Sequence, residues 1–274
     1  MEVVVAGGTV PELQANEWDA ARAGVCALVV MAKAPRAGKV KTRLAPALGF
    51  DGSAAINVCF LKDTTRNIAE VCEAGGAAGL VCYTPVGDEA AFDGLLPEAF
   101  VLIAQRGDAF GERLLAAAED ILSLGFGAVC LIDSDSPTIP QAALHTAVEE
   151  LAKPGDRVVL GGSDDGGYYL IGLKQAHSEP FENITWSTES VLEETVAQCE
   201  RAGLEIVRLP TWYDVDDAET LAVLQRELLD GIEPEFGCRE DSGAAMNWAF
   251  EVHGYDAKAT REFLMRRGAE TKKS

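Results

Sequence analysis

The chain has 274 residues, of which 44 are acidic and 23 basic, for a formal net charge of -21. Such an acidic surface repels nucleic acid and anionic membranes, so we expect neither as a partner. A hydrophobic fraction of 48% excludes a disordered chain, and the length suits one large α/β domain or two small ones.

The sequence pattern leads us to expect neither a signal peptide nor a membrane-spanning helix. Residues 1–14 carry no basic segment ahead of their short apolar run, unlike a signal peptide. No uninterrupted apolar stretch approaches the roughly 18 residues that a membrane-spanning helix needs. The seven cysteines are scattered without a C-x-x-C pair, which favours buried free thiols over disulfides or a zinc site. We therefore expect a cytoplasmic protein with no membrane span.

The predicted elements alternate between strands and helices. Short apolar, β-branched runs predict strands at 26–32, 79–84, 99–104, 128–133, 157–162, 168–173 and 204–209. Apolar residues at helical spacing predict helices at 53–75, 108–125, 140–155 and 187–203. Asp108 is expected to cap the second of these helices, and Ser187 or Thr188 the fourth.

This alternation predicts an α/β fold with a doubly wound, mostly parallel sheet that is covered by helices on both faces. In such sheets ligands bind at the carboxyl ends of the strands, where the strand order switches. The alternation spans residues 25–232, which we expect to form one domain. Residues 1–24 and 233–274 are expected to be terminal extensions, the second with a basic helix within 256–274.

The loop after the first strand, "KAPRAGKVKTRLAP" (33–46), concentrates positive charge in this acidic chain. It carries five cations within eleven residues: Lys33, Arg36, Lys39, Lys41 and Arg43. A P-loop is excluded, because that motif needs glycine where Lys33 stands and serine or threonine where Val40 stands. Its position at a strand end favours an anion-binding loop, and a solvated charge run is the alternative.

Acidic residues follow three other strands. Asp133 and Asp135 flank a serine in "IDSDSP", a pair that suits Mg²⁺ if the chain turns there and that otherwise serves as turn or capping aspartates. Asp164 and Asp165 lie in the glycine-rich turn of "GSDDGGYY", where glycine permits close approach of a ligand.

The third acidic cluster is "YDVDDAE", which holds Asp214, Asp216 and Asp217. We expect Asp217 to be the N-cap of the helix that follows. Together with the basic loop, the three clusters predict a site for a metal ion and a phosphate.

Other enzyme classes lack their motifs here. None of the three histidines lies near a nucleophile elbow of the G-x-S-x-G kind, which argues against a serine hydrolase. The G-x-G-x-x-G fingerprint is missing too, which argues against a nicotinamide-dependent enzyme.

Five motifs, in order, resemble a known family: "MAKAPRAGKVKTRLAPALG", "LIDSDSPTIP", "GSDDGGYYLIGL", "FENITWSTESVLEET" and "YDVDDAETL". They look like the bacterial GT-A-type glycosyltransferases associated with arsenosugar biosynthesis and radical-SAM clusters. That family is related to the molybdenum-cofactor nucleotidylyltransferases. The resemblance covers about residues 25–230 and implies a nucleotide-diphospho-sugar transferase fold.

The resemblance also implies roles for single residues. Lys33, Lys41 and Arg43 would face the phosphates of a nucleotide-sugar donor. Asp135 would be the main ligand of a divalent metal, Mg²⁺ or Mn²⁺, with Asp133 beside it and Asp216 completing the site. Asp165 would lie on the sugar or acceptor side, as the catalytic base if the reaction inverts the anomeric centre.

The segment "NITWSTESVLEE" has two interpretations. Trp186 can pack as a hydrophobic staple ahead of a capped helix, or it can offer an aromatic face to the acceptor, with Ser187 and Thr188 bonding the acceptor's polar edge.

The predicted function is metal-dependent transfer of a sugar from a nucleoside-diphosphate-sugar donor to a small-molecule acceptor. One rival is a nucleotidylyltransferase that releases pyrophosphate. A rival from another class is a non-catalytic nucleotide-binding subunit.

Overall fold

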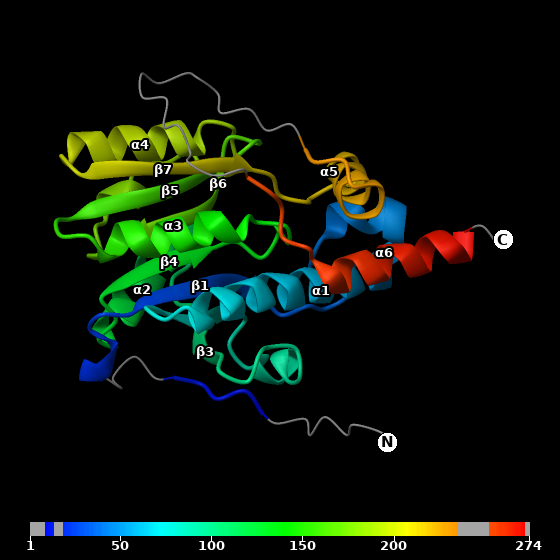
Figure 1. Ribbon diagram of the computed structural model, residues 1–274, viewed down its shortest axis with the longest axis horizontal. Coiled ribbons are helices and arrows are strands. Elements are labelled where there is room, and N and C mark those ends of the chain that lie inside the picture. Colours follow the sequence, from blue (N-terminus) through cyan, green and yellow to red (C-terminus); the bar gives the residue numbers. More distant parts are fainter. Residues whose placement is uncertain (1–8, 14–18, 235–251, 272–274) are drawn as a thin grey trace.

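The computed structural model describes residues 9–13, 19–234 and 252–271 (Figure 1). A seven-stranded sheet forms its centre, in the order β3-β2-β1-β4-β6-β5-β7. The strands are β1 (Cys26–Lys33), β2 (Ala77–Thr84), β3 (Val101–Ala104), β4 (Ala128–Ile132), β5 (Arg157–Ser163), β6 (Tyr168–Leu173) and β7 (Glu205–Trp212). All seven predicted strands are confirmed.

The sheet is parallel except at one strand. β1 pairs in parallel with β2 and β4, β2 with β3, and β5 with β7, whereas β6 runs antiparallel to both β4 and β5. Only residues 164–167 connect β5 to β6. A link of four residues is too short for a crossover helix and can form only a hairpin. The predicted mostly parallel sheet is therefore confirmed, with this hairpin as its one reversal.

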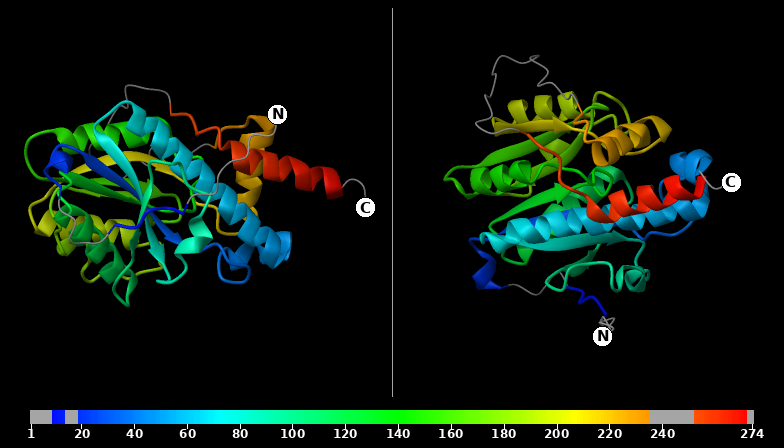
Figure 2. Two further views of the ribbon diagram at one scale, coloured as in Figure 1. Left: turned by 90° about the horizontal axis from the view of Figure 1, so that it is seen from below. Right: turned by 45° about the vertical axis from the view of Figure 1, so that its right-hand side comes forward.

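Helices cover both faces of the sheet (Figure 2). They are α1 (Ala45–Glu73), α2 (Phe110–Ser123), α3 (Gln141–Ala152), α4 (Val191–Arg201), α5 (Ala218–Gln225) and α6 (Lys258–Thr271). Short 3-10 turns occur at Ala20–Arg22, Thr42–Leu44, Glu89–Phe92 and Glu179–Phe181, and a π-helical turn, η5, at Arg226–Asp230. Residues of α1, α3, α5 and α6 share one buried cluster, and residues of α2 and α4 share the other.

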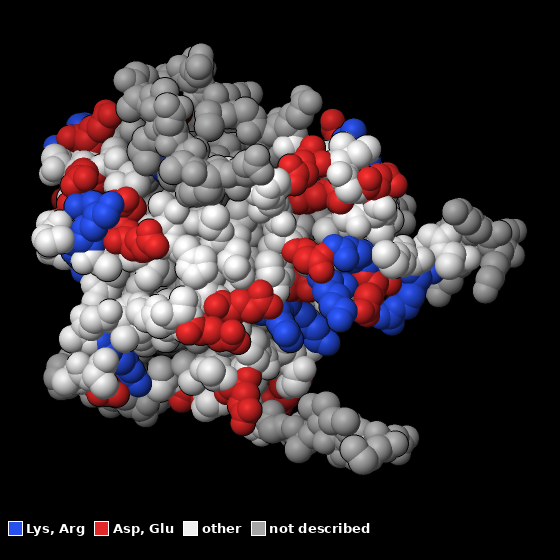
Figure 3. Space-filling model, in the orientation of Figure 1, with Lys and Arg blue, Asp and Glu red and all other residues white. Residues whose placement is uncertain are grey.

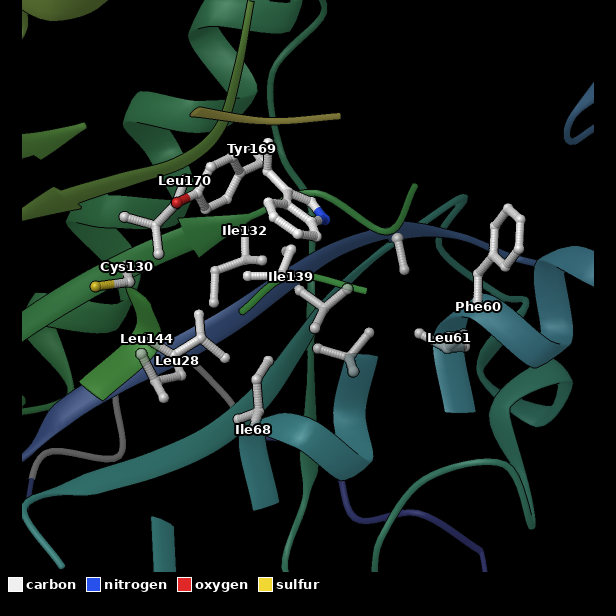
Figure 4. Close-up of a cluster of buried hydrophobic side chains, with 14 of the residues drawn as sticks. Leu28, Phe60, Leu61, Ile68, Cys130, Ile132, Ile139, Leu144, Tyr169 and Leu170 are labelled. Atoms are coloured by element: carbon white, nitrogen blue, oxygen red, sulfur yellow. The ribbon is translucent and has the colours of Figure 1, made fainter. Parts of the chain in front are cut away.

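The two clusters follow from the alternation of side chains along each strand. In β1, Leu28 and Val30 point into the cluster under α1 and α3, whereas Ala27 and Val29 point into the cluster under α2. Figure 4 shows the first cluster, in which Leu28 and Ile132 of the sheet lie near Leu144 of α3. Burying a side chain of this kind stabilises the fold by about 1.5–3 kcal/mol.

Two predicted helix starts are wrong. In α2 the cap does not come from Asp108: the Glu112 carboxylate reaches back and accepts the N–H groups of Asp108 and Ala109 at 3.0 and 3.1 Å. α4 begins at Val191 rather than at Ser187 or Thr188. Ser187 has a left-handed backbone, with φ at 64°, which a helix cannot continue from.

The long helix α1 is a core helix. By length and composition, Thr42–Glu73 is the one described helical stretch that could cross a membrane. Its inner face packs on the sheet, where Ile56, Phe60 and Ile68 are fully buried. This packing accounts for its apolar character.

The C-terminal helix α6 lies along α1 (Figures 1 and 2). Asp63 of α1 accepts the N–H groups of Ala259 and Thr260 at 2.9 and 2.8 Å, which caps the start of α6. This confirms the predicted helix in the tail. On the face in Figure 3 lysine and arginine gather beside α1 and α6 with acidic side chains among them. Within α6, Arg266 and Glu262 form an ion pair at 3.2 Å. The domain boundaries at residues 25 and 232 stay predictions. Residues 1–8, 14–18, 235–251 and 272–274 of the two predicted extensions lie outside the described residues.

The cysteines that the structure describes are free thiols. Four are buried and two, Cys59 and Cys72, are partly exposed. The sulfur atoms of Cys26 and Cys130 lie 3.8 Å apart in the core. Cys238 lies outside the described residues.

Candidate active site at the carboxyl ends of the strands

One cleft runs along the carboxyl edge of the sheet, at the switch in strand order between β1 and β4. It has two connected parts, which we call the basic half and the acidic half. The basic half has a volume of about 390 Å³ and is lined by the cations Lys33, Lys39, Lys41, Arg43 and Arg113. The acidic half has a volume of about 540 Å³ and is lined by Asp133, Asp165, Asp214, Trp186, Ser187, Thr188 and Glu189. Both halves share Met31, Arg43, Phe110, Ser134, Asp135 and Asp216.

Lys41 joins the two halves. Its ammonium nitrogen lies 2.8 Å from Oδ1 of Asp135 and 2.8 Å from Oδ1 of Asp216. The side chain is 4% exposed and its ammonium lies 5.7 Å from the ring centre of Phe60. Burial alone would lower the pKa of Lys41, but the charges of the two aspartates raise it above its ordinary value. Lys41 is therefore a buried ammonium paired with two carboxylates.

The local chain conformation aims Lys41 into the cleft. Val40 and Leu44 on either side are buried in the core and anchor the loop. Lys41 itself adopts the left-handed conformation, with φ at 45° and ψ at 42°. Because a residue without glycine's freedom pays for that conformation, it persists only where surrounding contacts hold it, as the two aspartates do here.

The other cations of the loop are more exposed. Arg43 is 73% exposed and its Nη1 lies 3.4 Å from Oδ2 of Asp216. Lys33, the last residue of β1, is exposed at the wall of the basic half. Arg36 instead pairs with Asp88, which does not line the cleft. The structure thus brings the predicted donor-side residues Lys33, Lys41 and Arg43 together.

Asp133 shapes the turn after β4. Its Oδ1 accepts the N–H groups of Asp135 and Ser136, both at 3.1 Å, and its Oδ2 accepts the Ser136 hydroxyl at 2.8 Å. Burial raises the pKa of the Asp133 carboxyl to about 8, and the nearby Asp135 charge adds to this. This arrangement favours the turn interpretation of Asp133, and it orients Asp135 toward Lys41.

The chain after β7 supplies three carboxylates with different contacts. Asp217 accepts the N–H groups of Glu219 and Thr220 and is the N-cap of α5, as predicted. Asp216 faces Lys41. Asp214 accepts the Ser163 hydroxyl at 3.2 Å, and burial, helped by the charges of neighbouring carboxylates, raises its pKa to about 6.

A backbone hydrogen bond links the two acidic loops. The N–H of Val215 donates to the carbonyl of Asp135 at 2.9 Å. The loops after β4 and β7 are thereby held at a fixed separation, with Asp135 and Asp216 facing the same ammonium.

The turn of Asp165 packs against the segment that carries Trp186. The N–H of Gly167 donates to Asp165 Oδ1 at 2.8 Å, and the N–H of Leu192 donates to the Gly166 carbonyl at 2.9 Å. A side chain at Gly166 would meet the backbone of Glu189 at 2.1 Å, so this close approach requires glycine. Asp165 is exposed and lines the acidic half.

Trp186 lies at the mouth of the acidic half. Its ring meets that of Phe110 edge to face, with centroids 5.0 Å apart. It also sits on the start of α2, where a side chain at Gly111 would meet the indole at 2.9 Å. The ring is half-buried, so the packing role and the acceptor role that were predicted for it are compatible.

Ser187 and Thr188 line the cleft without capping a helix. The Thr188 hydroxyl donates to the Thr185 carbonyl at 2.6 Å and lies 2.8 Å from the Ser190 hydroxyl. Ser187, in the wall of the cleft, has a left-handed backbone, which is a sparsely populated conformation for a residue other than glycine.

The carboxylate oxygens of Asp135 and Asp216 are suitable ligands for a divalent cation. Both carboxylates face one point, and Mg²⁺ is commonly held by one or two protein carboxylates plus phosphate and water oxygens. Within 9–13, 19–234 and 252–271, no group of three or more His, Cys, Asp or Glu side chains forms a metal cluster. The remaining ligands would therefore have to come from substrate and water.

The sequence pattern predicts no individual role for several cleft residues. Asp214 is predicted only as a member of an acidic cluster, although its position two residues after β7 marks it as a strand-end carboxylate. Phe110 and Arg113, on the first turn of α2, line the cleft because that helix starts at its rim. Nothing in the local sequence marks them.

Comparisons with known proteins agree with this fold. A family described as "Uncharacterized protein conserved in bacteria (DUF2064)" matches residues 67–188, less than half of the chain. The crystal structure of a "putative nucleotide-diphospho-sugar transferase" from Desulfovibrio desulfuricans G20 is similar, with a TM-score of 0.71 and 29% sequence identity. That similarity covers 89% of this chain and 95% of the other.

Two further structures are more distant. CMP:2-keto-3-deoxy-manno-octonic acid synthetase complexed with CTP gives a TM-score of 0.49 at 13% identity, over 76% of this chain and all of the other. Glucosyl-3-phosphoglycerate synthase from Mycobacterium tuberculosis, in complex with Mn²⁺, UDP and phosphoglyceric acid, gives 0.43 at 11% identity, over 81% and 84%. Similarity at this level does not establish a function. No curated protein matches the sequence significantly. The fold is of the nucleotide-diphospho-sugar transferase type, as predicted.

Proposed function

We propose that the protein is a metal-dependent glycosyltransferase that moves a sugar from a nucleoside-diphosphate-sugar to a small-molecule acceptor. The observation that carries the proposal is the shared cleft, in which a basic half and an acidic half meet at Asp135, Lys41 and Asp216. The similarity to the Desulfovibrio desulfuricans protein described as a "putative nucleotide-diphospho-sugar transferase", over most of both chains, supports it.

The basic half suits the leaving group. Breaking the bond between the anomeric carbon and the β-phosphate oxygen puts negative charge on the departing diphosphate. Lys33, Lys41 and Arg43 are the cations that would stabilise that charge through charge-assisted hydrogen bonds. A divalent ion, Mg²⁺ or Mn²⁺, held by Asp135 and Asp216 would supply further charge stabilisation, worth several kcal/mol in metal-assisted transfers.

The acidic half suits the acceptor. Asp165 is exposed to this half and is the candidate base that would take the acceptor's hydroxyl proton in an inverting reaction. Trp186 and Phe110 offer aromatic edges and faces against which a sugar or another ring can pack. Ser187 and Thr188 would bond the acceptor's polar edge.

A panel of nucleotide sugars and nucleoside triphosphates tests the proposal. Each is incubated with the protein, Mg²⁺ or Mn²⁺ and a mixture of hydroxylated small molecules, and the products are separated by anion-exchange chromatography. Release of a nucleoside diphosphate supports glycosyl transfer. Release of pyrophosphate from a triphosphate would support the nucleotidylyltransferase instead, and no release from any member would favour a non-catalytic subunit. The sequence resemblance also implies a link to arsenosugar biosynthesis. That link depends on which hydroxylated small molecule in the mixture receives the sugar.

A further inference from the structure

The ammonium of Lys41 occupies the point that the two candidate metal-binding carboxylates face. It lies 2.8 Å from an oxygen of Asp135 and 2.8 Å from an oxygen of Asp216, and it is shielded from water. Mg²⁺ binds its oxygens at about 2.0–2.1 Å, so an ion held by both aspartates would lie almost where the ammonium lies. The two cations exclude each other by size and by charge.

Displacing the Lys41 ammonium by the ion alone, or drawing it away by a diphosphate alone, would leave charged groups uncompensated. If an ion displaced Lys41, the buried ammonium would lose both of its countercharges, which is costly in a site removed from water. If a diphosphate drew Lys41 away, Asp135 would lose its cation, and Asp216 would keep only the exposed Arg43, whose Nη1 lies 3.4 Å away. Exchange of both partners at once leaves every charge compensated, because the ammonium gains phosphate oxygens and the carboxylates gain the ion.

The surroundings of Lys41 allow such a move. Lys41 lines the basic half, next to Lys39, Thr42 and Arg43, so a diphosphate bound there would lie beside the ammonium. The exposed cations Lys33, Lys39 and Arg43 also line the basic half, and their positive potential attracts an anion to it.

We propose that Lys41 is a built-in counter-cation that keeps the divalent ion out of the nucleotide-free protein and yields the two carboxylates to it when a diphosphate binds. This inference rests on the proposed function, because the ion and the diphosphate are the ligands of that reaction. Lys41 then competes with the ion in the nucleotide-free protein and donates to the phosphate once the diphosphate is bound. Ion and nucleotide bind with positive coupling, and by linkage each raises the affinity for the other.

The test is calorimetric titration of Mn²⁺ into nucleotide-free protein. We expect Lys41→Gln to bind Mn²⁺ about tenfold or more tighter than the wild type, since an ammonium about 3 Å from each carboxylate no longer competes. Lys39→Gln is the matched control: it removes the same charge from an exposed position of the same loop, and its Mn²⁺ affinity should stay within about threefold of the wild type. The double variant Lys41→Gln, Asp216→Asn should lose the gain, which assigns the ion to this pair.

Three results would overturn the inference. They are equal Mn²⁺ affinity of wild type and Lys41→Gln, including no binding to either; an equal gain in Lys39→Gln; and a gain that survives in the double variant.

A second measurement on the wild type guards against failure of Lys41→Gln to fold. In protein labelled with ¹⁵N at lysine side chains, the Lys41 ammonium signal is assigned by its absence from Lys41→Arg. Mg²⁺ alone should leave this signal in place, and inorganic pyrophosphate with Mg²⁺ should shift it. A shift with Mg²⁺ alone would contradict the inference.

The nucleotide-sugar panel separates this inference from the proposed function. Release of nucleoside diphosphate together with equal Mn²⁺ affinities would remove only the inference. A Mn²⁺ gain in Lys41→Gln without product from any nucleotide sugar would remove only the glycosyl transfer.

Discussion

The basic and acidic halves of the cleft hold their charges in different ways. In the basic half the cations stand on long side chains, and Lys33, Lys39 and Arg43 are exposed. In the acidic half the carboxylates are short and tied to the backbone, as Asp133 is to the turn after β4 and Asp165 to the N–H of Gly167. Long side chains can follow an anion as it moves, whereas fixed carboxylates preorganise a site.

We therefore expect the two halves of the cleft to tolerate substitutions to different degrees. A mobile cation can be replaced in part by its neighbours, so single losses in the basic half should cost moderate amounts of binding energy. A fixed carboxylate has no substitute, so losses where the halves meet should cost most. The predictions below test this ranking.

The largest effect is expected for Asp216→Asn, at the junction of the halves. The substitution removes a candidate ion ligand and one of the two countercharges of Lys41. We expect the rate of sugar transfer to fall about a hundredfold or more, in line with loss of several kcal/mol of charge stabilisation. The measurement is steady-state release of nucleoside diphosphate.

Asp217→Asn is the matched control, since that neighbour caps α5 and does not line the cleft. Its transfer rate should stay near that of the wild type. A wild-type rate in Asp216→Asn would mean that the junction takes no part in the reaction.

Within the basic half, Arg43→Ala should weaken nucleoside-diphosphate binding by about 1.5–3 kcal/mol, the range for a charge-assisted hydrogen bond. Arg36→Ala should weaken it less, because Arg36 pairs with Asp88 outside the cleft. Isothermal calorimetry on both variants compares them directly. Equal small losses would show that the loop is only a solvated basic surface.

Glu227 of η5 is half-buried and contacts the residue that follows β7. Tyr213 donates to Glu227 of η5, and burial raises the pKa of the Glu227 carboxyl to about 7. A carboxyl with a raised pKa binds its proton more tightly in the folded protein. Its stabilising contribution is therefore complete below the unfolded value near 4.5 and is lost as pH rises through about 7.

We expect the free energy of unfolding of the wild type to fall by about 1–2 kcal/mol between roughly pH 5 and pH 8 through this group. Glu227→Gln should lack that part of the fall. Urea unfolding of both proteins at several pH values measures it, and parallel pH profiles would show that Glu227 does not titrate in this range.

The smallest effect is expected at the rim of the acidic half. Trp186→Ala should raise the acceptor KM by a factor that corresponds to about 0.5–1.5 kcal/mol, the value of an aromatic contact beyond its buried area. It should also lower the melting temperature, because the ring packs on Phe110 and Gly111. Trp186→Phe keeps an aromatic ring and should restore most of both. A lower melting temperature with unchanged acceptor kinetics would leave Trp186 a packing role only.

Much of the fold could be predicted from the sequence. The strands are apolar, β-branched runs, and a pattern of that kind is specified locally, so their positions agree within a few residues. The link between β5 and β6 has only four residues, 164–167, and so indicates that β6 is antiparallel to β5. The pattern of apolar residues alone does not indicate this direction. The predicted start of α4 at Ser187 or Thr188 is wrong because Ser187 has a left-handed backbone, which cannot be predicted from a serine in the sequence.

The site could be predicted only as a set of strand-end residues. Chain order placed Asp135, Asp165 and Asp216 after strands, and the structure brings them to one cleft. The contact of Lys41 with two aspartates could not be foreseen. It depends on a left-handed residue between two buried anchors and on a backbone bond between loops far apart in sequence.

The most direct measurement asks which bond of the donor breaks. The nucleotide sugar that the panel selects is prepared with ¹⁸O between the anomeric carbon and the β-phosphorus, and it is incubated with protein, Mg²⁺ and acceptor. Phosphorus NMR then locates the label. Glycosyl transfer predicts ¹⁸O on the β-phosphate of the released nucleoside diphosphate, because the carbon–oxygen bond breaks and the cleft keeps the diphosphate in its basic half. Label retained in a released sugar or sugar phosphate would show cleavage at phosphorus and would contradict this assignment of the cleft.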